Sequence, residues 1–177
     1  MATFNEKTIS SEMIYKGAIL NLRRDKVTVK GGDYSYREIV EHNGGAVAVA
    51  LTEDNNVLLV KQFRKPMERD MIELPAGKIE IGEDPKETIE RELKEETGYT
   101  AKNIKLMAEF HPSVGYTSET LYIYLATELT SGETDFDEHE AIDLIQVPLE
   151  EAINMVIDGQ ITDGKTMAGL LLTKYHI

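Results

Sequence analysis

Three glutamates near the middle of the sequence have the chemistry and the spacing to bind a divalent cation. Glu92 and Glu96 are four residues apart, and Glu95 is three residues from Glu92. In a helix such residues share a face, where like charges destabilise the helix by roughly 0.2–0.5 kcal/mol per pair. Arg91 and Lys94 are close by, but neither falls between Glu92 and Glu96 on that face. A hard cation such as Mg²⁺ would compensate better, because it takes one or two carboxylates together with water and substrate phosphates.

A solvated acidic helix face is the plainer interpretation of the same glutamates, and the flanking glycines argue against it. Gly77 and Gly82 precede the segment and Gly98 follows it, which predicts a tight loop–helix–loop arrangement. Asp84 is a good N-cap and Pro85 fits the first helical position. We therefore predict a helix that begins at this cap and ends just before Gly98.

Hydrophobic patterning predicts the elements that must position this helix. Ile89 and Leu93 are four residues apart, so both can point from the helix into the core. Residues 46–51 are apolar on both faces, which predicts a central buried strand with residues 57–63 as its antiparallel partner. Further strands are expected at 19–30, 34–41, 71–74, 105–110, 121–126 and 142–147, and further helices at 148–158 and 163–175. This order predicts an α+β domain rather than repeated βαβ units.

The totals exclude several classes of function. The 177 residues can bury a real core, and 19 basic against 32 acidic residues give a net charge of −13. Such a balance argues against a nucleic-acid partner, although bound cations would still allow a small phosphorylated ligand. The absence of cysteine excludes disulfides, thiolate zinc sites and a cysteine nucleophile. With no secretory signal and no membrane-spanning apolar run, we expect a cytoplasmic protein without a membrane partner.

The segment from Gly77 to Tyr99 resembles the Nudix box, the signature of the Nudix hydrolases. Every fixed position matches and Tyr99 is a mild departure at the last one; the matching residues are Gly77, Glu83, Arg91, Glu92, Leu93, Glu95, Glu96 and Gly98. The resemblance implies a Nudix fold, in which a mixed β-sheet is sandwiched between helices. It also implies hydrolysis of a nucleoside diphosphate linked to another group, by attack of water on phosphorus with Mg²⁺ or Mn²⁺ bound.

The same resemblance implies roles for individual residues. Glu92 and Glu96 are the expected catalytic metal ligands, and Glu95 is a further ligand or a group next to the ligands. The carbonyl of Ala76 is expected to be a backbone ligand. Arg91 would orient Glu83 or Glu92 through a charge-assisted hydrogen bond.

Beyond the box, the chain resembles ADP-ribose pyrophosphatases over nearly its whole length. The matching pieces are residues 37–40, 45–49, 60–66 and 73–77 and the acidic loop near residue 138. These enzymes convert ADP-ribose and water to AMP and ribose 5-phosphate. The resemblance implies that Arg37, Arg64 and Glu73 contact substrate, and a guanidinium such as that of Arg64 can hold a phosphate with two hydrogen bonds. A surface arginine and a strand-end glutamate are the plainer alternatives.

An acidic loop at residues 135–140 is the expected source of the general base. Glu138 aligns best with the base of the resembling enzymes, and Glu140 with a further carboxylate near the metal. A carboxylate close to bound cations can take a proton from an activated water. An ordinary acidic surface loop is the alternative.

One departure weakens the choice of substrate. The resembling enzymes carry Ser-Pro-Gly after the box, whereas this chain has Val114 between Ser113 and Gly115. Ser113, Gly115 and Glu119 are still expected to contact substrate. The departure leaves GDP-mannose or another nucleotide sugar as the nearest alternative, and the sequence does not rank NADH or flavin adenine dinucleotide either.

The resemblance also implies an organisation and a partner. Residues 1–42 are expected to form an N-terminal antiparallel β extension that serves dimerisation and the substrate site, and residues 43–177 the Nudix hydrolase domain. A homodimer follows from this expectation. A non-catalytic sensor of nucleotide sugars is the alternative from another class of function, and the complete set of carboxylates argues against it.

Overall fold

A computed structural model describes residues 4–132 and 142–177 of the chain. Its contacts divide the chain into two compact units. The first, which we call the N-terminal unit, comprises residues 1–44 and 111–120. The second, the main unit, comprises residues 45–110 and 121–177. Segment 111–120 therefore belongs with the N-terminal strands, although it follows the box in sequence.

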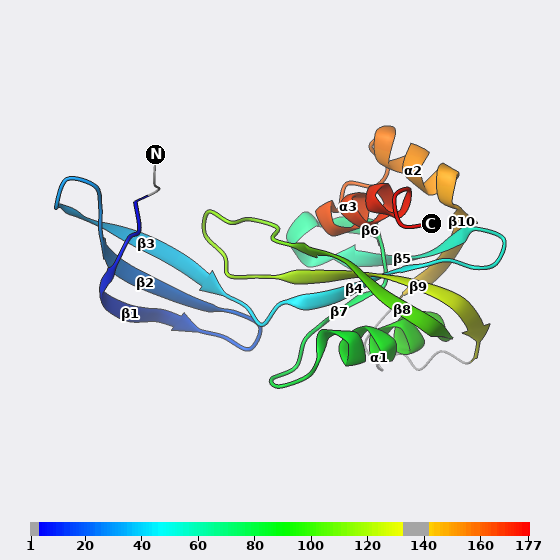
Figure 1. The fold of residues 1–177 in the computed structure, drawn as a ribbon, viewed down its shortest axis with the longest axis horizontal. Helices are drawn as coiled ribbons and strands as arrows, with labels where there is room; N and C mark the ends of the chain where they lie inside the picture. Colours follow the sequence, from blue (N-terminus) through cyan, green and yellow to red (C-terminus); the bar gives the residue numbers. More distant parts are fainter. Residues whose placement is uncertain (1–3, 133–141) are drawn as a thin grey trace. The chain divides into compact units, whose positions relative to one another are not determined.

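The N-terminal unit is a three-stranded antiparallel sheet (Figure 1). Its order is β1 (Thr8–Lys16), β2 (Asn21–Thr28) and β3 (Tyr34–Glu41). Gly31 and Gly32 connect β2 to β3 with φ angles of 106° and 90°, a conformation that glycine adopts without strain, and the predicted hairpin is confirmed. Segment 111–120 is tied to β3 at Val40, whose N–H donates to the Tyr116 carbonyl at 2.7 Å.

The described residues of the main unit, 45–110, 121–132 and 142–177, form two sheets and three α-helices. One sheet has the order β7 (Ala76–Lys78), β4 (Gly45–Ala50), β9 (Leu121–Ser131) and β8 (Tyr99–Phe110), in which β4 and β9 are parallel. The other is antiparallel, with the order β10 (Asp143–Pro148), β5 (Asn56–Arg64) and β6 (Arg69–Glu73). Helix α1 (Pro85–Thr97) covers one side of the strands, and α2 (Leu149–Ile157) and α3 (Gly164–Thr173) cover the other (Figure 1). A 3₁₀ turn, η1 (Lys65–Met67), follows β5. The predicted α+β class is confirmed.

The predicted pairing of the two buried runs was wrong. Strand β4 has β7 and β9 as neighbours, and β5 has β10 and β6, so only the isolated bridge between Leu51 and Val57 joins the two runs. Residues 46–51 and 57–60 are buried on both faces, and full burial shows that a strand is central without showing which strands flank it. Asn55 makes the turn with φ 57°, after which the strands diverge into separate sheets.

Alternation along β4 serves two cores. Val47 and Val49 face the core that includes residues of α2 and α3, whereas Ala46, Ala48 and Ala50 face the core beneath α1. The small alanines leave room for the residues that α1 buries. Strand β4 is thus the spacer between the helix layers.

Helix α1 forms where the sequence predicted it. The Asp84 carboxylate accepts the Lys86 N–H at 2.8 Å, and Gly98 ends the helix with φ 75°. Ile89 and Leu93 are both fully buried, which confirms their predicted direction. Burial of each contributes about 1.5–3 kcal/mol, so the opposite face of α1 can carry charged side chains without loss of anchoring. No helix among residues 4–132 and 142–177 has the length and apolarity to span a membrane.

Candidate functional site

The carboxylates of α1 converge on the backbone of β7. A Cβ atom added to Gly77 would lie 1.9 Å from Cδ and Oε1 of Glu92, so the Glu92 carboxylate lies directly against the Gly77 Cα. The Glu96 side chain is buried, and its Oε2 accepts the Ala76 N–H at 2.9 Å. The structure therefore brings Ala76, Glu92 and Glu96 together. It also explains the glycine, because any side chain at position 77 would displace Glu92.

Arg91 organises the acidic side chains around α1. Its Nη1 donates to Glu92 Oε1 at 2.7 Å and to Glu95 Oε2 at 3.0 Å, and its Nε donates to Glu83 Oε1 at 3.2 Å. The predicted hydrogen bonding of Arg91 is confirmed for both Glu83 and Glu92. Arg91 thus supplies positive charge to this face even though it does not fall between Glu92 and Glu96, because its long side chain reaches both Glu83 before the helix and Glu95 one turn further along it.

These contacts shift the pKa values of the partners. The Arg91 guanidinium, together with the Glu80 N–H and the Thr88 side chain, lowers the pKa of Glu83 to about 2. Hydrogen bonding to Glu83 in turn raises the pKa of Arg91. Both groups are therefore charged across the physiological range.

The donor set at β7 and α1 fits a hard divalent cation. Within residues 4–132 and 142–177, no three His, Asp or Glu side chains are grouped so that they could hold a metal ion by themselves. Glu95, for example, is turned towards Arg91. Yet Mg²⁺ needs only one or two carboxylates, and the Glu92 carboxylate lies in the space over Gly77, beside the backbone of β7. Water, substrate phosphates and the Ala76 carbonyl would complete such a coordination shell.

Arg64 and Glu73 form an ion pair at the adjoining strand ends. Arg64 donates from Nε to Glu73 Oε1 at 2.7 Å and from Nη2 to Oε2 at 2.9 Å. Burial alone would raise the pKa of Glu73, but the Arg64 hydrogen bonds and the charge of Lys165 lower it to about 2. Glu96 also contributes to the raised pKa of Arg64, which places this guanidinium within electrostatic reach of the α1 carboxylates. Arg64 therefore binds Glu73 through two hydrogen bonds.

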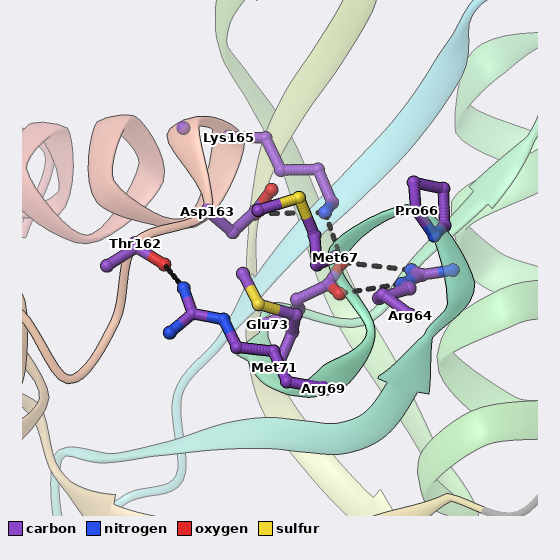
Figure 2. A pocket seen from close by; sticks show the side chains of 10 residues that line it. Arg64, Pro66, Met67, Arg69, Met71, Glu73, Thr162, Asp163 and Lys165 are labelled. Atoms are coloured by element: carbon purple, nitrogen blue, oxygen red, sulfur yellow. Dashed lines mark hydrogen bonds and ion pairs between the residues drawn. The ribbon is translucent and has the colours of Figure 1, made fainter.

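Sequence reasoning missed the partners that α3 contributes. Lys165 Nζ donates to Glu73 Oε2 at 2.5 Å and to Asp163 Oδ2 at 2.9 Å. Figure 2 shows Glu73 between Arg64 on one side and Lys165 with Asp163 on the other. A cavity of about 490 Å³ opens here; its lining residues are Arg64, Pro66, Met67, Arg69, Met71, Glu73, Thr162, Asp163, Gly164 and Lys165. An N-cap signal at Asp163 was available in the sequence, but nothing there indicates contact with Glu73, which is 92 residues away from Lys165.

The other predicted substrate residues lie in the N-terminal unit. Arg37 on β3 is paired with Glu6, with Nε 3.0 Å from Oε2, so a substrate phosphate would have to replace that carboxylate. Ser113 begins a turn, since its carbonyl accepts the Thr117 N–H at 3.2 Å. Glu119 Oε1 lies 3.5 Å from His42 Nδ1.

Two positions of segment 111–120 bear on the substrate prediction. Gly115 has open space around its Cα and is exposed. Val114, at the departure from the expected proline, is 82% exposed. A side chain this exposed does not pack within the chain. We therefore expect valine in place of proline at position 114 to affect the binding of a ligand or partner rather than the fold.

The predicted general base and its neighbour lie outside the described residues. Glu138 and Glu140 fall between the described ranges, which stop at 132 and resume at 142. Their roles stay predictions from the sequence.

Known proteins resemble this chain in sequence and in fold. Residues 42–170 match the family described as "NUDIX domain". An ADP-ribose pyrophosphatase of Bacillus subtilis (strain 168) is 42% identical over 168 residues, which cover 94% of this chain and 91% of that protein. A methanol dehydrogenase activator of Bacillus methanolicus is 41% identical over 166 residues, which cover 93% and 90%. A crystal structure of an "ADP compounds hydrolase" superposes with a TM-score of 0.87 at 19% identity, over 99% of this chain and 95% of that one.

Proposed function

We infer that this chain, which belongs to the Nudix family, hydrolyses the pyrophosphate bond of ADP-ribose to AMP and ribose 5-phosphate with a divalent cation bound. The observation that carries this proposal is the convergence of Glu92 and Glu96 on the Ala76–Gly77 backbone. The relative named ADP-ribose pyrophosphatase supports the choice of substrate, because the match covers almost the whole of both proteins.

In the proposed mechanism, Glu92, Glu96 and the Ala76 carbonyl hold the cation, with Glu95 beside them. When bound, Mg²⁺ or Mn²⁺ would neutralise phosphate charge and lower the pKa of a bound water. Arg91 keeps the Glu92 carboxylate in place through its 2.7 Å hydrogen bond. Arg64 offers a guanidinium to a phosphate near these carboxylates.

The proton balance of the reaction requires a base. The oxygen of the attacking water forms a bond to phosphorus while the bridging P–O bond breaks. We propose that Glu138 takes the proton from this water and that Glu140 is a further carboxylate near the metal. A pH-dependent loss of kcat in Glu138→Gln would support the assignment, whereas a neutral Glu138→Gln with an essential neighbouring carboxylate would contradict it.

Six residues are proposed to contact substrate. Arg64 and Glu73 would act from the main unit, and Arg37, Ser113, Gly115 and Glu119 from the N-terminal unit. The test is a panel of ADP-ribose, GDP-mannose, NADH and flavin adenine dinucleotide, each assayed with Mg²⁺ and with Mn²⁺ and with the products identified. The highest kcat/KM for ADP-ribose is expected. Because Val114 replaces the expected proline, a preference for GDP-mannose is the outcome that would correct the substrate.

A regulatory role is the second candidate, and the relative named as a methanol dehydrogenase activator is the observation that favours it. A sensor would bind a nucleotide sugar without turning it over. Tight binding by calorimetry with no product from any member of the panel would favour the sensor over the hydrolase.

We also propose that the chain forms a homodimer through the N-terminal unit. Every residue of β1 is exposed, including Ile9, Met13, Ile14 and Tyr15, and an apolar strand of this kind favours contact with another chain. Size-exclusion chromatography with light scattering should give twice the chain mass at micromolar concentration, and a monomer would contradict the proposal. A cytoplasmic location stays a prediction.

A further inference from the structure

We propose that Asp163, Lys165 and Thr166, at the start of α3, are positioning residues for the hydrolytic site. They would fix the backbone from Glu73 to Gly77, and with it Arg64 and the surface on which Glu92 and Glu96 lie. The inference rests on the proposed function, because it names residues that support that same site. It is carried by a chain of hydrogen bonds that begins on α3 and ends at α1.

This series of hydrogen bonds begins at the Asp163 carboxylate. Its Oδ2 accepts the Thr166 N–H at 3.0 Å, the Thr166 hydroxyl at 2.6 Å and Lys165 Nζ at 2.9 Å. One oxygen therefore orients both neighbouring side chains. Thr166 is fully buried and Lys165 is largely buried, so solvent cannot readily replace these contacts.

Each of the oriented side chains reaches the strand end that follows β6. The Thr166 hydroxyl oxygen accepts the Leu74 N–H at 2.9 Å, and Lys165 Nζ donates to the Glu73 carboxylate. Leu74 is itself almost fully buried. A Cβ atom added to Gly169 would lie 2.7 Å from Leu74 Cδ1, so α3 lies closely against this residue.

The next three residues carry the connection to α1. The Pro75 carbonyl accepts the Ala48 N–H of β4 at 2.9 Å, and Ala76 donates its N–H to Glu96. Gly77 lies against the Glu92 carboxylate. Each position from Glu73 to Gly77 is thus held by a specific contact, with α3 at one end and α1 at the other.

The charges favour a positioning role over a second ligand site in the cavity. Its lining carries three cations, and each is engaged: Arg64 and Lys165 with Glu73, and Arg69 with the Thr162 hydroxyl at 3.0 Å. A phosphate inside the cavity would have to displace the buried Glu73 carboxylate from Arg64 and Lys165, which is unfavourable. Arg64, whose side chain is 40% exposed, can still meet a substrate phosphate outside the cavity. The same pairs instead keep Glu73 ionised and Arg64 in a fixed direction.

The test uses two substitutions, each of which removes a different contact from this series of hydrogen bonds. Thr166→Val removes the acceptor of the Leu74 N–H, so the Ala76–Gly77 surface should shift, and Mn²⁺ affinity and kcat should each fall about 10-fold to 100-fold. Lys165→Met removes one cation from Glu73, so Arg64 should be misplaced and KM for ADP-ribose should rise about 10-fold while Mn²⁺ affinity changes less. Electron paramagnetic resonance measures Mn²⁺ binding independently of turnover.

Matched controls separate positioning from stability. Thr173→Val removes another buried hydroxyl of α3, which donates to the Gly169 carbonyl at 2.8 Å. Lys174→Met removes a lysine at the C-terminal end of α3, which pairs with exposed Glu150. Both controls should keep wild-type Mn²⁺ affinity, kcat and KM even where Tm falls. The conservative variants Thr166→Ser and Lys165→Arg should restore most of the wild-type values.

Three results would contradict the proposed positioning role or the proposed function. If Thr166→Val and Lys165→Met lower Tm as Thr173→Val does but leave Mn²⁺ affinity, kcat and KM unchanged, the cluster is only structural and the proposal is overturned. If Thr166→Val does not fold, Lys165→Met decides the question. A folded Lys165→Met variant with wild-type Mn²⁺ affinity, kcat and KM overturns the proposal by itself. If the wild-type chain binds Mn²⁺ but does not hydrolyse ADP-ribose, the proposed function fails, and the Mn²⁺ affinity of the variants still decides the positioning role.

Discussion

The backbone from Glu73 to Gly77 separates two charged clusters of opposite design. Around α1, one guanidinium serves several carboxylates, because Arg91 donates to Glu83, Glu92 and Glu95. Around the start of α3, one buried carboxylate is served by two cations, because Arg64 and Lys165 both donate to Glu73. A group of carboxylates suits a cationic ligand, whereas a buried carboxylate with two cationic partners holds the backbone that carries it in one conformation.

The largest effect is expected on the α1 side of this comparison. Glu92→Gln and Glu96→Gln each keep the size of the side chain but remove a charge that would hold the cation. The kcat should fall by several orders of magnitude while circular dichroism and Tm stay close to wild type. Glu90→Gln, on the same helix but paired at its surface with Lys86 at 3.8 Å, is the control and should retain activity. Full activity in Glu92→Gln would remove α1 from the mechanism.

The next largest effect is expected from the backbone between the clusters. In Gly77→Ala, the new methyl group would coincide with the Glu92 carboxylate, which must then move. A displacement of about 1 Å at a catalytic group typically lowers turnover about 10²-fold, and steady-state kinetics with saturating metal would measure it. Unchanged kcat/KM in Gly77→Ala would show that Glu92 can act from another position.

A smaller effect is expected when the guanidinium of Arg91 is replaced by an ammonium group. Arg91→Lys keeps the charge but cannot donate to Glu83, Glu92 and Glu95 at once, because an ammonium group lacks the planar fork of guanidinium. Activity should fall about 10-fold to 100-fold, chiefly through weaker metal activation. A titration of the rate with Mg²⁺ checks this, and identical half-saturation for the variant and wild type would argue against an orienting role.

The ion pairs of Glu73 should make the free energy of unfolding depend on pH. The pKa of Glu73 is lowered from 4.5 to about 2 on folding, so its ionised form stabilises the native state fully above pH 4.5. That contribution, about 3 kcal/mol, is lost as the pH falls from 4.5 towards 2. Urea unfolding of wild type and Glu73→Gln should therefore differ most at neutral pH and converge near pH 2. A difference that is constant with pH would mean that Glu73 is not the titrating group.

The smallest effect is expected from an ion pair outside both clusters. Lys102 Nζ lies 2.7 Å from Glu128 Oε2, but both side chains are more than half exposed. Lys102→Gln should leave the midpoint of urea unfolding and kcat/KM unchanged. A clear fall in the unfolding midpoint would show that exposure is a poor guide to which ion pairs stabilise this protein.

Much of the fold could be predicted from local pattern. The cap at Asp84, the terminating glycine at position 98 and the buried pair Ile89 and Leu93 define α1 within a dozen residues, so short-range chemistry is sufficient. The antiparallel pairing of β4 with β5 could not be excluded in this way. Uniform burial marks a strand as central, but its neighbours depend on how the whole core packs.

The candidate site also has one part that local sequence predicts and another that depends on how distant segments pack. The carboxylates of α1, Gly77 and the family could be read from the sequence, because these residues lie within one short motif whose spacing follows the helix. The pairing of Arg64 with Glu73, and the contacts of Lys165 and Thr166 with the same strand end from 92 residues away, became visible in the folded chain alone. A buried ion pair depends on where two backbone segments distant in sequence pack together, and no local spacing of residues encodes that contact.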